Sequence, residues 1–83
     1  MTKDNSQNTT SYIVSLTWDE EASVWVAESK DIPGLILESG SIDALIERLR
    51  FAIPELLTLN GIDYSDGLSI CYRVERYERV LVQ

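Results

Sequence analysis

A single amphipathic helix between residues 41 and 60 constrains the fold of this chain more than any other segment. Its aliphatic side chains recur at three- and four-residue steps, which places them on one stripe of an α-helix. Ser41 suits the N-cap position, and Asp43 meets the positive end of the helix dipole. The pair Asn60-Gly61 supplies the stop. Such a stripe needs a sheet to cover it. Its members are Ile42, Leu45, Ile46, Leu49, Ile53, Leu56 and Leu57.

Two residues depart from this helical pattern. Pro54 lacks a backbone N–H and its ring meets the carbonyl of Arg50, so we expect a kink or a short break near residues 52–53. Phe51 lies about 180° from the centre of the stripe. Either the kink and the following loop tuck its ring against the body, or the ring anchors a contact with another chain.

Alternating apolar and polar residues predict strands on both sides of the helix, at residues 12–18, 24–28, 35–38 and from residue 68 onward. The acidic loop 19–23 closes a hairpin between the first two strands. Asp31-Ile-Pro-Gly34 forms a turn into the third. Residues 76–83 alternate weakly, and they could extend the last strand, form a short extra strand or pair with another subunit.

The predicted order is β-β-β-α-β, which indicates an α+β domain of two layers. The helix crosses from the third strand so that the fourth can join the first in parallel. The result is a four-stranded, mostly antiparallel sheet with one helix on one face and an open opposite face. With 83 residues, we expect one domain at residues 12–83 after a disordered polar tail at residues 1–11.

Trp25 and Cys71 raise the question of which side chains the sheet buries. If Trp18 and Val24 are opposite partners in the hairpin, Trp25 lies on the open face beside Thr17. There it either caps the sheet locally or anchors an interface, because tryptophan is common among residues that dominate binding energy. Cys71 lies in an apolar strand pattern, so we expect a buried, unreactive thiol.

The distribution of charge limits the possible partners. Fourteen acids and seven bases give a net charge of −7, and residues 1–47 hold nine of the acids but only Lys3 and Lys30. Such a field opposes binding to phosphate backbones and favours a basic partner, although it also simply keeps a cytosolic protein soluble. Arg73, Arg76 and Arg79 alternate with acids, so we expect a solvated strand edge rather than a basic ridge.

The sequence contains no pattern that points to catalysis. It has no histidine, and its first strand has no carboxylate for a two-metal nuclease. It also lacks a P-loop, a nucleophile elbow and a Gly-rich dinucleotide turn. We therefore expect no enzymatic activity, no cofactor and no metal. The single cysteine, the absence of a leader pattern and the absence of a long apolar run favour the cytoplasm.

Four segments together resemble a known family: Tyr12-Ile-Val-Ser-Leu-Thr-Trp-Asp-Glu-Glu-Ala, Val24-Trp-Val-Ala, Asp31-Ile-Pro-Gly, and the capped helix from Ser41 with Pro54-Glu-Leu-Leu. Over about residues 12–75 the chain is similar to the DUF1902 group of the HicB-like antitoxin superfamily. The resemblance implies a degenerate ribonuclease-H-like fold without nuclease activity. It also implies binding to a small basic HicA-type mRNA interferase, whose catalytic histidine or RNA surface is blocked.

Two functions are therefore predicted. The first is an interaction module that neutralises a basic toxin, in which acids set the approach and an indole slows dissociation. The alternative is a module without a toxin that only self-associates, as a homodimer or a higher homo-oligomer. Neither involves direct contact with nucleic acid or a membrane. The candidate partner-binding residues are Asp19, Glu20, Glu21, Trp25, Glu28 and Asp31. The candidate oligomer residues are Phe51, Tyr77, Val80 and Val82.

Overall fold

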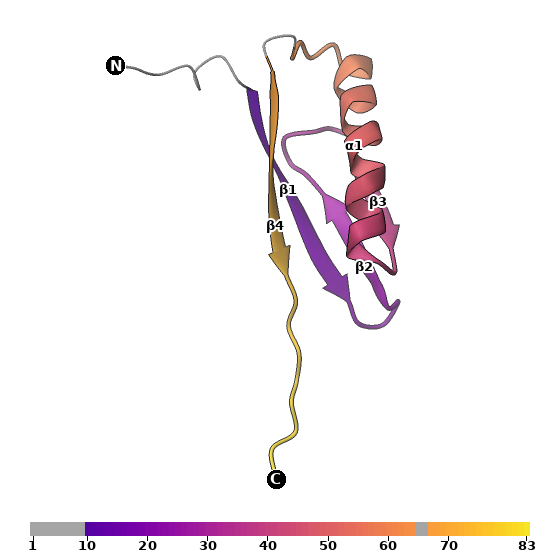
Figure 1. The fold of residues 1–83 in the computed structure, drawn as a ribbon, viewed down its shortest axis with the longest axis vertical. Helices are drawn as coiled ribbons and strands as arrows, with labels where there is room; N and C mark the ends of the chain where they lie inside the picture. Colours follow the sequence, from indigo (N-terminus) through magenta and orange to yellow (C-terminus); the bar gives the residue numbers. More distant parts are fainter. Residues whose placement is uncertain (1–9, 65–66) are drawn as a thin grey trace, which may run out of the picture.

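The computed structural model describes residues 10–64 and 67–83. In this part of the chain, one helix packs on one face of a four-stranded sheet, so the predicted α+β class and β-β-β-α-β order are confirmed (Figure 1). The elements are β1 (Thr10–Asp19), β2 (Val24–Glu28), β3 (Ile36–Ser39), α1 (Ile42–Leu59) and β4 (Leu68–Glu75).

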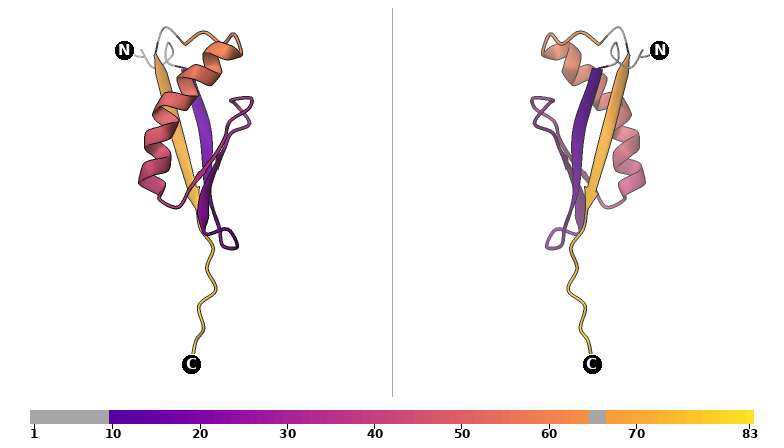
Figure 2. Two further views of the ribbon diagram at one scale, coloured as in Figure 1. Left: turned by 90° about the vertical axis from the view of Figure 1, so that its right-hand side faces the viewer. Right: turned by 90° about the vertical axis from the view of Figure 1, so that its left-hand side faces the viewer.

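The strand order in the sheet is β3-β2-β1-β4. The pairs β1–β2 and β2–β3 are antiparallel, and β4 joins the other edge of β1 in parallel, as predicted. Because β3 and β4 lie at opposite edges, the chain between them must cross the sheet, and α1 makes this crossing. Figure 2 shows the helix on one side of the sheet only. We call the covered side the inner face and the other side the open face.

The core lies between α1 and the inner face. The helical stripe has the predicted role, because Leu45, Leu49, Ile53 and Leu57 are buried and the other three members pack against them. Ser29 and Asp31 hold the β2–β3 connection against β1, since the Ser29 hydroxyl donates to the Ile13 carbonyl at 2.7 Å. The buried residues are Tyr12, Val14, Leu16, Ala27, Ile32, Leu35, Leu45, Leu49, Ile53 and Leu57.

The ends of α1 match the sequence, but its middle does not. The Ser41 side chain accepts a hydrogen bond from the Ala44 N–H at 3.2 Å, and Gly61 at φ +70° permits the closing turn. Of the predicted kink or short break near residues 52–53, the break does not occur, since the helix runs without interruption to Leu59. Burial of Ile53 and Leu57 on either side of the proline holds the backbone helical against a loss of about 3 kcal/mol.

The hairpin register differs from the predicted one by one residue. Val24 pairs with Asp19, and Trp25 therefore pairs with Trp18. The turn explains the shift, because the Ser23 N–H donates to the Asp19 carbonyl at 2.8 Å and Ser23 adopts a left-handed φ of 57°. A shift of one residue moves every side chain of a strand to the other face. The prediction that Trp25 lies on the open face is thus wrong, and it lies on the inner face.

Three further boundaries and exposures differ from expectation. β1 begins at Thr10, so the polar tail expected at residues 1–11 ends earlier, and residues 1–9 lie outside the described residues. Cys71 is exposed, not buried, because it alternates with Ile70 and Tyr72 and so lies on the open face. Beyond β4, residues 76–83 neither extend the strand nor form another one within the chain (Figure 1).

Candidate protein-binding site

Two tryptophans and an arginine form a cluster at the tip of the β1–β2 hairpin, which we call the tip cluster (Trp18, Glu20, Trp25 and Arg76). The indole rings meet edge to face, with centroids 5.4 Å apart and planes at 62°. The Arg76 guanidinium carbon lies 4.4 Å from the centroid of Trp18 and 5.8 Å from that of Trp25. The Trp18 indole N–H donates to the Glu20 carboxylate at 2.9 Å.

Arg76 is the residue at which the chain leaves the sheet, and its contact with Trp18 fixes the backbone there. β4 pairs with β1 up to the contact of Glu75 with Thr17, so the next residue lies beside Trp18. From the sequence, we predict for Arg76 only that it lies with Arg73 and Arg79 on a solvated strand edge. The signal that locates it is the parallel register between β1 and β4, which the sequence alone does not provide.

The predicted partner-binding residues divide into two groups at opposite ends of the hairpin. Asp19, Glu20 and Glu21 surround the tip, whereas Glu28 and Asp31 lie at the far end of β2. Four residues of strand separate the two ends, or about 13 Å. Asp31 has a structural role as well, since its carboxylate accepts from the Ile13 N–H at 2.8 Å. The six residues therefore lie in two groups instead of one cluster, and their role in partner binding stays a prediction.

Asp19 and Trp25 also have structural roles. The Asp19 carboxylate accepts from the Ala22 N–H at 3.2 Å and so stabilises the hairpin turn. Trp25 is half-buried against the core and lies beside Arg76. An indole held in this way stabilises the tip, and it does not project from the open face.

The open face carries Glu38 and Glu75, which were not among the predicted partner-binding residues, together with the predicted Asp19 and Glu28. Glu38 lies beside Val26, which lies beside Thr17, which lies beside Glu75, in one row across all four strands. Glu28 occupies the next row. Within the described residues, no hydrogen bond or ion pair engages the carboxylates of Glu28, Glu38 and Glu75, and the two β2 valines are half-exposed. The fourth acid, Asp19, accepts from the Ala22 N–H. The open face comprises Ser11, Ile13, Ser15, Thr17, Asp19, Val24, Val26, Glu28, Ile36, Glu38, Ser69, Cys71, Arg73 and Glu75.

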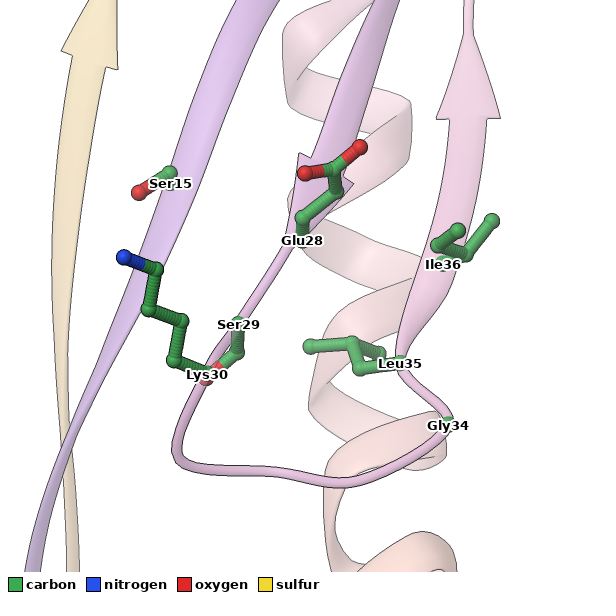
Figure 3. Close-up of a pocket in the computed structure, with 7 residues that line it drawn as sticks. All are labelled: Ser15, Glu28, Ser29, Lys30, Gly34, Leu35 and Ile36. Carbon is green, nitrogen blue, oxygen red and sulfur yellow. The ribbon is translucent and has the colours of Figure 1, made fainter.

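A shallow cavity of about 410 Å³ lies at one end of the open face. Figure 3 shows Glu28 and Ile36 projecting from neighbouring strands, with Lys30 reaching across β1 toward Ser15. The Ile36 side chain is 66% exposed. A carboxylate beside an exposed isoleucine suits a partner side chain with an apolar stem and a cationic end. The lining residues are Ser15, Glu28, Ser29, Lys30, Gly34, Leu35 and Ile36.

The predicted oligomer residues are all exposed, but they lie in two places. Phe51 is 75% exposed on the outer side of α1, where Leu59, which the sequence did not identify, adds a second apolar side chain. Both line a hollow of about 660 Å³. Tyr77, Val80 and Val82 lie in the C-terminal segment, which leaves the molecule near the N-terminal end of α1 (Figure 1). We call residues 76–83 the arm.

The family model for the domain of unknown function DUF1902 matches residues 11–83. The chain belongs to the DUF1902 family. Its fold is also similar to the crystal structure of the hypothetical protein TTHA1013 from the extremely thermophilic bacterium Thermus thermophilus, with a TM-score of 0.67 and 37% sequence identity. The match covers 88% of this chain and 100% of the thermophile chain. No protein with a curated description matches the chain.

Two kinds of feature are absent from the described residues of this DUF1902 domain. Among residues 10–64 and 67–83, no group of three potential metal ligands comes together. No helix in the same part of the chain has the length and apolar character to cross a bilayer. The described residues display three exposed features: the carboxylates of the open face, the apolar side chains of the arm, and Phe51 with Leu59 on α1.

Proposed function

We propose that this DUF1902 protein is a non-catalytic module that binds a small basic protein of the HicA mRNA-interferase type and blocks its action on RNA. The observation that supports this most is the open face, where the carboxylates of Glu28, Glu38 and Glu75 lie around half-exposed valines and, in the described part of the chain, make no hydrogen bond or ion pair. Such a module acts in the cytoplasm, where mRNA is translated.

The open face combines charged groups, which attract a partner, with apolar area, which the partner can bury. Its acids attract a cationic partner over a range of roughly 10 Å, which raises the rate of encounter. Val26 and Ile36 supply apolar area at the centre and at one edge, and burial of this area slows dissociation. Lys30 and Arg73 are the nearby cations, and they give the partner a defined orientation.

Affinity capture with matched charge variants tests this proposal. The protein is immobilised and exposed to lysate of its own cell at low and at moderate salt. One variant removes the open-face charge by Glu28→Gln, Glu38→Gln and Glu75→Gln. A control removes an equal charge from the exposed side of α1 by Asp43→Asn, Glu47→Gln and Glu55→Gln. We expect a small basic protein on the parent and on the control, and its loss from the open-face variant.

Activity then decides the class of partner. The captured protein is purified and tested for RNA cleavage, which the parent chain should suppress and the open-face variant should not. Equal loss on both charge variants would show attraction by net charge alone. A captured protein that does not cleave RNA would remove the interferase assignment.

A second candidate function is self-association, and a specific observation favours it. Four large apolar side chains of the arm are exposed to at least 70%. Exposed apolar residues concentrated in one segment mark a contact site for a partner. The open face and the arm meet at Glu75 and are otherwise different surfaces, so one protein can have both functions.

A further inference from the structure

The arm continues an edge strand into solvent. β4 lies at one edge of the sheet, so one of its sides carries unpaired backbone donors and acceptors. Beyond Glu75 the chain stays extended and exposed up to Gln83 (Figures 1 and 2). An edge strand with a long extension is a template for pairing with another strand.

The charges around Tyr77 are arranged so that two antiparallel copies of this segment place opposite charges at facing positions. Residues 74–80 are Val-Glu-Arg-Tyr-Glu-Arg-Val. In an antiparallel pair of identical strands centred on Tyr77, each Glu75 faces an Arg79 and each Arg76 faces a Glu78. The same arrangement places Val74 opposite Val80. Opposite charges at facing positions stabilise an antiparallel pair, and facing aliphatic side chains pack together.

We propose that two copies of this chain pair antiparallel through β4 and the arm, with the twofold axis at Tyr77. The occupant of the free β4 edge is therefore the arm of a second copy. A twofold interface requires that residue i meets residue j and that j meets i, and the segment satisfies this at both charge pairs. The two sheets then join into one sheet of eight strands.

Among the registers within two residues of it, this one alone pairs the charges favourably. Sliding one strand by a single residue puts Glu75 opposite Glu78 in one direction and Arg76 opposite Arg79 in the other. Sliding it by two residues puts Arg76 opposite its own copy, or Glu78 opposite its own copy. Like charges at facing positions destabilise a strand pair. The charge pattern thus selects the register centred on Tyr77 from its neighbours.

The same register covers a part of the fold that α1 leaves exposed. Val74 lies on the inner face, where its side chain is 51% exposed, and Tyr72 on the same face is half-exposed. Directly opposite residues of an antiparallel pair share a face. The partner's Val80 and the partner's Val82 therefore meet Val74 and Tyr72 on the inner face. A cleft of about 160 Å³ between α1 and β4, lined in part by Tyr72 and Ile70, lies beside them.

The tip cluster holds Arg76 in place before it pairs with Glu78 of the partner subunit. Arg76 is held over the Trp18 ring on the inner face, at 4.4 Å from its centroid. The partner's Glu78 would lie on that same face, directly opposite Arg76. A guanidinium that is already positioned loses less side-chain freedom when it forms an ion pair.

Charge exchange between facing positions tests the register. The dimer dissociation constant is measured on the full chain by sedimentation, without any other protein. Arg79→Glu places like charges opposite each other twice per dimer, so we expect the dissociation constant to rise about tenfold or more. Glu75→Arg should do the same. The double variant with both changes restores opposite charges, and its constant should return to within about threefold of the parent.

Two controls keep the interpretation specific. Glu55→Arg makes the same charge change as Glu75→Arg on the exposed side of α1, and it should leave the dissociation constant unchanged. Far-ultraviolet circular dichroism checks that each variant is folded. A parent that is monomeric at all concentrations overturns the proposal. Failure of the double variant to recover, when it is folded, also overturns it.

Cross-linking gives an independent measure of the axis. In a Cys71→Ser background, single cysteines are placed at residues 76, 77 and 78 in turn. Position 77 faces itself across the axis, so Tyr77→Cys should form a disulfide-linked dimer fastest under mild oxidation. Equal rates at the three positions, or a maximum at 76 or 78, contradict the register. Because these measurements use the purified chain alone, their outcome is separate from that of the toxin-binding test.

Discussion

The two halves of residues 68–83 both alternate apolar and polar residues, but only the first half pairs with another strand of the chain. β4 alternates apolar and polar residues and pairs with β1 over its whole length, so that Ile70 and Tyr72 contact the core. The arm also carries apolar residues, but Tyr77 and Val80 remain exposed. The difference lies in the neighbour, because β1 turns into the hairpin at Asp19 and offers no strand beyond it. An alternating pattern thus gives a buried strand only where another strand reaches it.

The tip cluster is the boundary between these halves. Arg76, the first residue of the arm, stacks on Trp18, and the next residues have no contact of this kind among the described residues. Substitutions on the two sides of this boundary should therefore affect different properties. Those before it should lower the stability of each chain, and those after it should lower association.

Trp25→Ala should have the largest effect on stability. The indole packs against the core and against Trp18, so its removal should lower the free energy of unfolding by about 3 kcal/mol. Urea denaturation followed by circular dichroism measures this. Val26→Ala, one residue away on the open face, is the control, and it should cost under about 1 kcal/mol. Equal effects would mean that the assigned hairpin register is incorrect.

Ile70→Ala and Leu81→Ala compare the two halves directly. Ile70 packs against the core, so its truncation should lower stability by about 2 kcal/mol at every protein concentration. Leu81 is 86% exposed, and its truncation should change stability by less than about 0.5 kcal/mol when the protein is dilute. The Leu81→Ala effect should grow with concentration, because association adds to stability by mass action. A large, concentration-independent effect of Leu81→Ala would place the arm in the core of its own chain.

Arg76→Ala removes the contact at the boundary. A guanidinium stacked on a tryptophan at the protein surface contributes about 0.5–1 kcal/mol, and we expect a loss of that size. The fluorescence of Trp18 should change as well, since the cation leaves its ring. Arg79→Ala, in the arm, serves as the comparison and should leave both the stability of the dilute chain and the tryptophan emission unchanged. Matching effects of the two substitutions would mean that the boundary is not at residue 76.

The smallest expected effect concerns Tyr72 and pH. Partial burial raises the pKa of the Tyr72 hydroxyl above its ordinary value of 10.0, while the Arg50 guanidinium acts in the opposite direction. The unfolded chain therefore loses this proton at a lower pH than the folded chain does. The stabilisation is present below about pH 10 and is lost as the pH rises through the raised pKa. Tyr72→Phe should show a shallower loss of stability with rising alkaline pH, and identical slopes would contradict this.

The sequence was sufficient for the parts of the fold that depend on local periodicity. The helical stripe, the Ser41 cap and the order of strands each follow from spacing along the chain, and the structure confirms them. The hairpin register was missed because it depends on how the turn closes, which Ser23 decides with a positive φ. That single shift moved Trp25 to the other face.

The candidate site was less predictable than the fold. The individual acids were visible in the sequence, but which of them share a face depends on pairings between strands. Glu38 and Glu75 lie at opposite ends of one row on the open face only because β3 and β4 flank the hairpin. Arg76 and Trp18 are far apart in sequence, and no local pattern connects them. The functions of toxin binding and self-association stay predictions.

The position of β1 in the sheet has a consequence for the order of folding. β1 is an interior strand, yet its parallel partner is the last strand of the chain, and Thr10 pairs with Leu68. Closing so long a loop is slow, because its entropy is lost before the contacts form. During synthesis the hairpin, β3 and α1 leave the ribosome first, and one edge of β1 stays unpaired until residue 75 emerges. Pairing of β4 with β1 therefore completes the sheet and, at the same time, fixes the position from which the arm extends.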